Sequence, residues 1–140
     1  PWLTRIQKMG DARLWMPTNK VIPGFQYSVI YYGPNLLTKA PEVGRRFMIA
    51  YLQGVRQYNQ GKTAYNIATI AKYTEDDPQL LQEACWALIH NDGHIDIQSV
   101  LDFQAWLLKK SAIDSIVSKN QFWDDRFIEY ANHVLGQSQP

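Results

Sequence analysis

The stretch from Val21 to Gly54 constrains the fold more than any other part of the chain. It opens with a Pro23-Gly24 turn, continues as an apolar, β-branched and aromatic run from Phe25 to Tyr32, and turns again at Gly33-Pro34. Both alternating faces of the run are largely apolar. This pattern predicts a strand that is buried on both sides, as in a sheet covered by helices.

From Pro41 onward the apolar period changes from two to 3.6, which predicts a long amphipathic helix that ends at Gly61. Proline costs no hydrogen bond at the first helical position, and Glu42 in the first turn suits the helix dipole. The side chains that we expect on the buried stripe of this helix are Val43, Phe47, Ala50, Tyr51, Val55 and Tyr58.

The rest of the chain predicts a short strand at residues 12–16 and several more helices. One short helix precedes the strands, over residues 3–10, and is stopped by Gly10. The later helices are expected to begin at Thr63, at Asp77-Pro78, at Asp96 and at Asp124 or Asp125. We expect the helix that begins at Asp77-Pro78 to continue past Cys85 to Leu88, with both side chains turned inward. Asn91-Asp92-Gly93 predicts a turn.

The predicted fold class is therefore α/β, with two or three strands followed by about five helices. We expect a single incomplete domain over residues 1–140, with the strands in residues 1–36 and a helical part in residues 37–136. Two strands alone would leave exposed sheet edges, which a self-sufficient domain normally covers. This predicts that the sheet takes further strands from outside this chain.

The composition fits a globular protein of one domain. Of its 140 residues, 46% are hydrophobic and 13% aromatic, which is too apolar for a disordered segment. No apolar run approaches the ~18 residues that cross a bilayer. The chain begins Pro1-Trp2-Leu3, which we interpret as the interior of a longer protein or a processed product. A single cysteine, Cys85, excludes an intramolecular disulfide and a metal-binding thiol pair.

The net charge of +1 hides an asymmetry between the two halves. Residues 1–62 carry nine basic and two acidic side chains, a balance of +7, whereas residues 63–140 carry five basic and eleven acidic side chains, a balance of −6. The basic residues are spaced singly and do not form the clusters typical of nucleic-acid patches. We therefore expect no nucleic-acid partner.

The order of turn, apolar run, second turn and Pro-Glu-led helix resembles the last part of a family of periplasmic substrate-binding proteins. These proteins serve ABC importers for nitrate, sulfonates, taurine and thiamine precursors. The resemblance continues through Asp92-Gly93, the helix with Gln104 and Trp106, and Phe122 to Gly136. It implies the C-terminal portion of a type 2 periplasmic binding fold, with two α/β lobes around a cleft. It also implies a signal peptide in the full-length protein and a periplasmic or extracytoplasmic location, with or without a lipid anchor.

The function implied by the resemblance is the capture of a small solute, without chemistry, for delivery to a membrane permease. The implied partners are the solute, the ABC permease and the rest of the same polypeptide; no cofactor is implied. In this family a Pro-aromatic pair lines the ligand cleft, and Pro1 and Trp2 match that pair. We therefore predict Pro1 and Trp2 as ligand-binding residues. The basic early segment favours an anionic solute.

Two other kinds of site, a metal site and a catalytic site, lack residues that they require. His90 to Asp96 places two histidines and two aspartates at alternate positions, but the segment does not match a calcium loop and no nearby Cys or further His completes a zinc set. No catalytic motif for acyl transfer, nucleotide binding or dinucleotide binding is present. We predict neither a metal site nor an enzyme.

Two alternatives remain open. One is an enzyme resembling the thiamine-pyrimidine synthases of the same superfamily, whose His and Cys motifs would have to come from another part of the protein. The other is a free-standing helical interaction module that uses the basic helix face of Arg45, Arg46 and Arg56. A fragment should dimerise or aggregate, whereas a module should be monomeric and stable.

Overall fold

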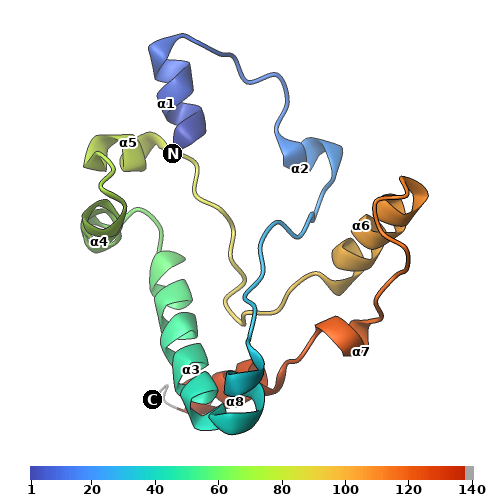
Figure 1. Cartoon of the computed structure of the whole chain (residues 1–140). Helices are drawn as coiled ribbons and strands as arrows, with labels where there is room; N and C mark the ends of the chain where they lie inside the picture. The colour runs from blue at the N-terminus through green and yellow to red at the C-terminus, as the bar shows by residue number, and fades with distance from the viewer. Residues whose placement is uncertain (138–140) are drawn as a thin grey trace.

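The computed structural model describes residues 1–137, and within them the chain is about 60% helical with no strand (Figure 1). The elements in chain order are α1 (Trp2–Met9), α2 (Thr18–Val21), a π-helical turn η1 (Asn35–Lys39), α3 (Pro41–Tyr58), α4 (Ala64–Thr74), α5 (Pro78–Glu83), α6 (Ile97–Lys109), α7 (Lys119–Phe122) and α8 (Arg126–Gln137).

The predicted α/β fold is wrong, because the two segments predicted as strands have no neighbour to pair with. Phe25 to Tyr32 does run without helical structure, but no backbone-to-backbone hydrogen bond joins residues 26–32 to any other described residue. Residues 12–16 likewise lack backbone partners among the described residues. The side chains of Tyr27 and Tyr31 are 88% and 89% exposed. An apolar run forms a sheet only when a second strand satisfies its backbone groups.

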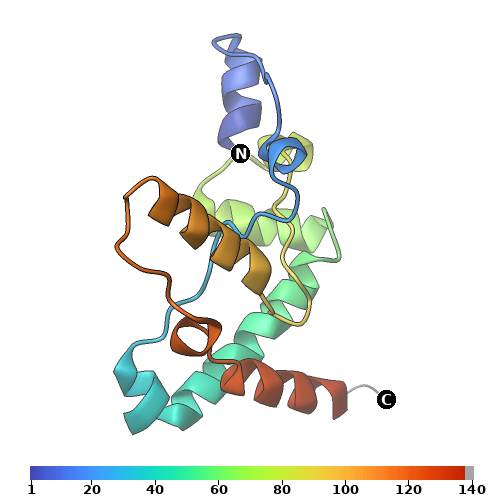
Figure 2. The same ribbon diagram turned by 90° about the vertical axis from the view of Figure 1, so that its right-hand side faces the viewer.

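The main core lies where α3 and α8 cross (Figure 2). Phe127 is 1% exposed, and its ring packs against Gly44, where a side chain on α3 would block it. The ring of Tyr32 meets Phe127 edge-on, with centroids 5.2 Å apart. The buried side chains of this core are Met48, Leu52, Phe127, Ile128, Ala131 and Leu135.

Helix α3 begins as predicted but buries a different face. Pro41 is in its first turn with Glu42, and the helix ends at Tyr58, before Gly61. The buried residues are Gly44, Met48, Leu52 and Val55, whereas Val43 and Phe47 are nearly half exposed. The predicted stripe therefore lies one residue too early, with only Val55 shared. Gly44 is the reason, because its missing side chain makes room for Phe127 and turns this face inward.

The capping predictions for α4, α5 and α6 are confirmed. Thr63 Oγ1 accepts a hydrogen bond from the Asn66 amide, Asp77 caps α5, and Asp96 Oδ1 accepts from the Ser99 amide at 2.9 Å. However, α5 ends at Glu83, five residues short of the predicted end at Leu88. Cys85 and Leu88 follow the helix in an extended segment and are exposed, so their predicted burial is wrong.

The helices form an open arrangement in which the α3–α8 crossing is the main core. In Figure 1, α1 and α5 lie at the opposite end of the molecule from α8, and α6 stands to one side. The accessible surface is 10654 Å² for a chain of 16.2 kDa. A folded monomer of this mass typically exposes about 7,500 Å². The chain thus leaves roughly 3,000 Å² more surface uncovered than a self-contained domain of its size.

Candidate functional site

The predicted ligand residues Pro1 and Trp2 lie at the start of α1. Pro1 precedes the helix, and the Trp2 side chain is 68% exposed. The Arg5 guanidinium lies 4.9 Å from the centre of the indole ring, a cation–π contact. Arg5 Nη2 also donates to Asp76 Oδ1 at 2.9 Å. The indole is therefore held at the junction of α1 with the start of α5, and it lines neither of the two hollows described below.

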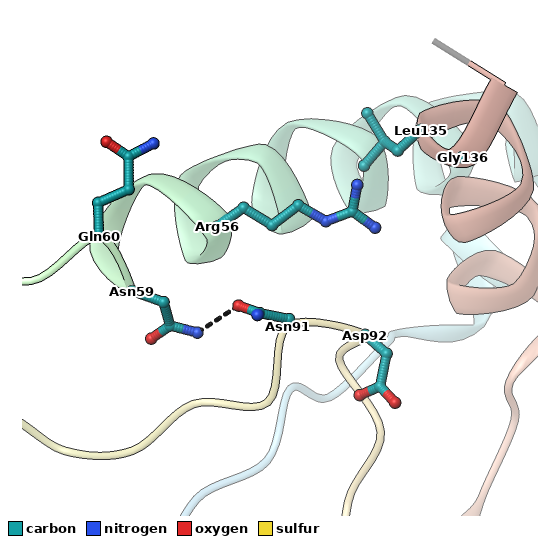
Figure 3. A pocket seen from close by; sticks show the side chains of 7 residues that line it. All are labelled: Arg56, Asn59, Gln60, Asn91, Asp92, Leu135 and Gly136. Carbon is teal, nitrogen blue, oxygen red and sulfur yellow. Dashed lines mark hydrogen bonds between the residues drawn. The ribbon is translucent and has the colours of Figure 1, made fainter. Parts of the chain in front are cut away.

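The larger hollow, about 570 Å³, lies where the C-terminal half of α3, α8 and the turn at Asn91-Asp92 meet (Figure 3). Arg56 extends along α3 toward Leu135, and Asn59 points at Asn91. The lining residues are Arg56, Asn59, Gln60, Asn91, Asp92, Leu135 and Gly136. One guanidinium and several side-chain amides give this hollow a polar wall.

Most of those polar groups already have protein partners. Arg56 Nη2 donates to Asn132 Oδ1 at 3.1 Å, and Asn132 Nδ2 donates to the Asp92 carbonyl at 2.8 Å. Asn59 Nδ2 donates to the Ile89 carbonyl at 2.7 Å and also to Asn91 Oδ1. These bonds clamp residues 89–92 onto α3 and α8. The arrangement therefore supports a structural clamp better than a solute site.

The smaller hollow, about 500 Å³, lies between α3 and α4. It is lined by Gln53, Gly54, Gln57, Tyr58, Tyr65, Asn66, Thr69 and Ile70. Asn66 is 4% exposed, and its Nδ2 donates to the carbonyls of Gln57 and Gly61, both at 2.7 Å. The amide thus satisfies the backbone at the α3–α4 turn, where a buried polar group needs such partners.

The histidine-rich turn does not assemble a metal site. His94 Nε2 lies 3.1 Å from Glu129 Oε1, and His94 Nδ1 lies 3.4 Å from Asp92 Oδ2. His90 and Asp96 make no contact with this group in the described hydrogen bonds and ion pairs. In the part of the chain that the structure describes, no group of three or more His, Cys, Asp or Glu side chains has a geometry that holds a metal ion. The turn itself, with Gly93 at φ 76°, is confirmed.

Three partly buried tyrosines have altered acidity. Burial raises the pKa of Tyr32 to about 12, and the nearby charges of Asp124 and Tyr51 act in the same direction. Burial also raises the pKa of Tyr51 and of Tyr58. At Tyr58 a hydrogen bond to the Ala87 carbonyl partly opposes this rise in pKa. These groups stay protonated and neutral near pH 7, so none of them is a base.

Sequence reasoning missed the contacts of Gln26. Its backbone N–H donates to Ser99 Oγ at 2.8 Å, and its Oε1 accepts from the Asp96 amide at 2.9 Å. Phe25 meets Phe103 of α6 edge-on at 5.4 Å. These contacts attach the extended run to the start of α6. The Asp96 cap signalled the start of that helix, but nothing in the sequence signalled its partner about 70 residues away.

The most unusual feature of the surface is its apolar content. Within the described residues, twenty-four large hydrophobic side chains are exposed, and thirteen of them belong to residues 1–31. Trp15 is 90% exposed, and Tyr27 and Tyr31 are nearly as exposed. Single exposed apolar residues are normal, but dense groups of them mark surfaces that another molecule covers.

Comparisons with known proteins give no family assignment: no family model, no curated protein and no solved structure matches this chain. Among the helices of residues 1–137, none has the length and apolarity that a membrane span requires.

Proposed function

We propose that the chain is the C-terminal part of the substrate-binding component of an ABC importer. In this proposal the complete protein captures a small solute outside the cytoplasm and delivers it to a membrane permease. It carries out no chemical reaction. The basic first half of the chain favours an anionic solute, such as a sulfonate, nitrate or carboxylate.

The observation that carries this proposal is the uncovered apolar surface. A surface excess of roughly 3,000 Å² is comparable to what large, permanent protein interfaces bury. Much of the apolar part of this surface lies in residues 1–31, which include the predicted ligand pair Pro1 and Trp2. An incomplete binding protein explains this surface, because the rest of the same polypeptide would cover it.

Two local features agree with the resemblance on which the proposal is based. The turn at Gly24, with φ 74°, leads into an extended run, and Pro41 then starts a long helix. The Trp2 indole is exposed and available for stacking against a planar or apolar part of a solute.

The test is a ligand screen on the complete polypeptide. The open reading frame that encodes residues 1–140 is read upstream and expressed in full, and thermal shift is measured with nitrate, taurine, alkanesulfonates and pyrimidine precursors. We expect an export signal, one solute class that raises the melting temperature, and a loss of that shift in Trp2→Ala. A frame that starts at or near Pro1, or a complete protein that none of these solutes stabilises, would overturn the proposal.

A free-standing helical interaction module is the second candidate, and the helical character of the described residues favours it. Its proposed basic face is less available than the sequence indicated. Arg45 pairs with Glu42 and stacks on Tyr130, and Arg56 bonds to Asn132. Sedimentation of the 140-residue chain separates the two candidates: a stable monomer at all concentrations supports the module, and self-association supports the fragment.

A further inference from the structure

Helix α1 is attached to the molecule through complementary charges. It carries Arg5 and Lys8 and no acidic residue, whereas residues 75–83 carry four acidic side chains and no basic one. Arg5 Nη2 lies 2.9 Å from Asp76 Oδ1, and Lys8 Nζ lies 2.6 Å from Glu83 Oε2. Arg5 and Lys8 are three residues apart and so share one face of the helix. They meet acidic residues at the two ends of α5.

Burial in this attachment is only partial. No residue of α1 is buried, and its apolar side chains Leu3, Ile6 and Met9 are 47%, 39% and 66% exposed. The segment that leaves the helix, residues 11–16, makes no backbone hydrogen bond among the described residues. In Figure 2, α1 projects from the rest of the molecule. Two ion pairs thus join a helix with no fully buried side chain to the ends of α5.

Ion pairs of this kind are sensitive to their surroundings. Arg5, Lys8 and Glu83 have side chains that are 40% or more exposed, and only Asp76, at 14%, is largely covered. Exposed pairs are individually weak, and dissolved salt screens them. A helix of eight residues that is held in this way can leave its docking site without disturbing the α3–α8 core.

We propose that α1 is an electrostatic latch: a mobile arm that is closed by the Arg5–Asp76 and Lys8–Glu83 pairs and opens when these pairs are screened or removed. Trp2 lies in the first turn of the arm, so opening displaces its indole from the start of α5. The latch itself depends only on contacts within this chain. Only the further consequence, that opening moves a solute-binding residue, rests on the proposed function.

The lone cysteine offers a direct measurement. Cys85 is exposed and lies two residues after Glu83, so a nitroxide attached there reports on its neighbours through line broadening of amide NMR signals. In dilute buffer we expect strong broadening over residues 2–9. In 1 M NaCl, where the screening length falls to about 3 Å, we expect the broadening to decrease by about half or more. Undiminished broadening in 1 M NaCl would show that packing, not charge, holds the arm.

Matched variants isolate the two pairs. The double variant Arg5→Gln with Lys8→Gln should reproduce the effect of salt in dilute buffer, whereas Arg13→Gln with Lys20→Gln should not, although both remove two positive charges. Exchanging the signs, with Arg5→Glu and Lys8→Glu combined with Asp76→Lys and Glu83→Lys, should restore the broadening. Failure of the exchange to restore it, or an equal effect of the control variant, would overturn the latch.

Two further measurements separate opening of the arm from unfolding and from self-association. Carbon chemical shifts of residues 2–9 show whether α1 stays helical after release, and unchanged signals from Leu52 and Ala131 show that the core is intact. A mixture of isotope-labelled chain without nitroxide and unlabelled chain with nitroxide detects broadening between molecules. Self-association, which the proposed function predicts, is the only source of broadening in the mixture, so the two proposals fail or succeed separately. Broadening of α1 that is as strong in the mixture as in the sample in which every chain carries the nitroxide would overturn the latch.

Discussion

The α3–α8 crossing and the first 31 residues use similar amino acids to opposite effect. In the crossing, six side chains from two helices bury one another, and Phe127 is almost completely covered. In residues 1–31 an equally apolar set, with Trp2, Trp15 and Tyr27 among it, stays exposed along one short helix, one helical turn and extended chain. Hydrophobic residues therefore define a core only where the chain itself supplies both surfaces.

The difference has a geometric cause. Helix α3 satisfies its own backbone groups, so it needs only one apolar partner face, and α8 provides it from near the end of the chain. The extended run from Phe25 to Tyr32 needs a neighbouring strand to pair with its backbone, and the described residues provide none; its packing contacts are confined to its ends, at Phe25 and Tyr32. The same hydrophobicity thus produces a packed region in one place and an interaction surface in the other.

The largest expected effect is the loss of the Phe127 ring. Phe127→Ala removes the best-buried aromatic side chain of the crossing together with its contact to Tyr32. We expect it to lower the free energy of unfolding by about 3–5 kcal/mol. Urea unfolding followed by near-UV circular dichroism measures this change. If the decrease is below about 1 kcal/mol, the crossing is not the core that organises the chain.

Gly44 provides a second and smaller test of the same contact. A methyl group at Gly44 would collide with the Phe127 ring, whereas one at Gly54, on the same helix, meets nothing within 4 Å. We expect Gly44→Ala to destabilise the protein by about 1–3 kcal/mol. Gly54→Ala should instead stabilise it by about 0.5–1 kcal/mol, because alanine is the better helix former. Equal effects of the two variants, measured by thermal unfolding, would contradict the close packing of α3 on α8.

The pH dependence of the crossing follows from Tyr32. Burial raises the pKa of this phenol from 10.0 to about 12 in the folded chain. As the pH rises, the unfolded state therefore releases the Tyr32 proton before the folded state does. The stabilisation of the folded state by the neutral Tyr32 phenol is complete below pH 10 and is lost as the pH rises to about 12. We expect the urea midpoint to fall across this window and to fall less in Tyr32→Phe. Tyr31→Phe, whose side chain is 89% exposed, is the control and should follow the wild type.

The sequence predicts the features that depend on neighbouring residues and misses those that depend on distant ones. The caps at Thr63, Asp77 and Asp96, the stop at Gly10 and the turn at Gly93 all depend on neighbouring residues, and all were predicted. The strand predictions were wrong because strand formation depends on a distant partner, which periodicity cannot supply.

The buried face of α3 was misplaced for a similar reason. Hydrophobicity assigns no weight to Gly44, although its lack of a side chain admits Phe127 from a helix far along the chain. The candidate sites show the same limit: Pro1 and Trp2 were found through a local pattern, whereas the Arg56–Asn132 contact and the α1 latch join residues about 70 or more positions apart. That Pro1 and Trp2 line a ligand cleft remains a prediction.

The smallest effect on stability should come from the exposed aromatic residues, and it sharpens the comparison most. Trp15, Tyr27 and Tyr31 are each about 90% exposed, so replacing all three by serine removes almost no packing. We expect each change to alter the free energy of unfolding by less than about 0.5 kcal/mol. The apparent mass in sedimentation should nevertheless fall toward 16.2 kDa at concentrations where the unmodified chain self-associates.

A triple replacement of Leu88, Tyr65 and Tyr73 by serine is the matched control, because these side chains are exposed but lie outside residues 1–31. It should leave self-association largely unchanged. Equal loss of association in both variants would mean that non-specific hydrophobic contacts, and not one defined surface, bring the molecules together. A loss of stability in the first variant would mean instead that residues 1–31 belong to the packed structure, and the contrast between the two regions would disappear.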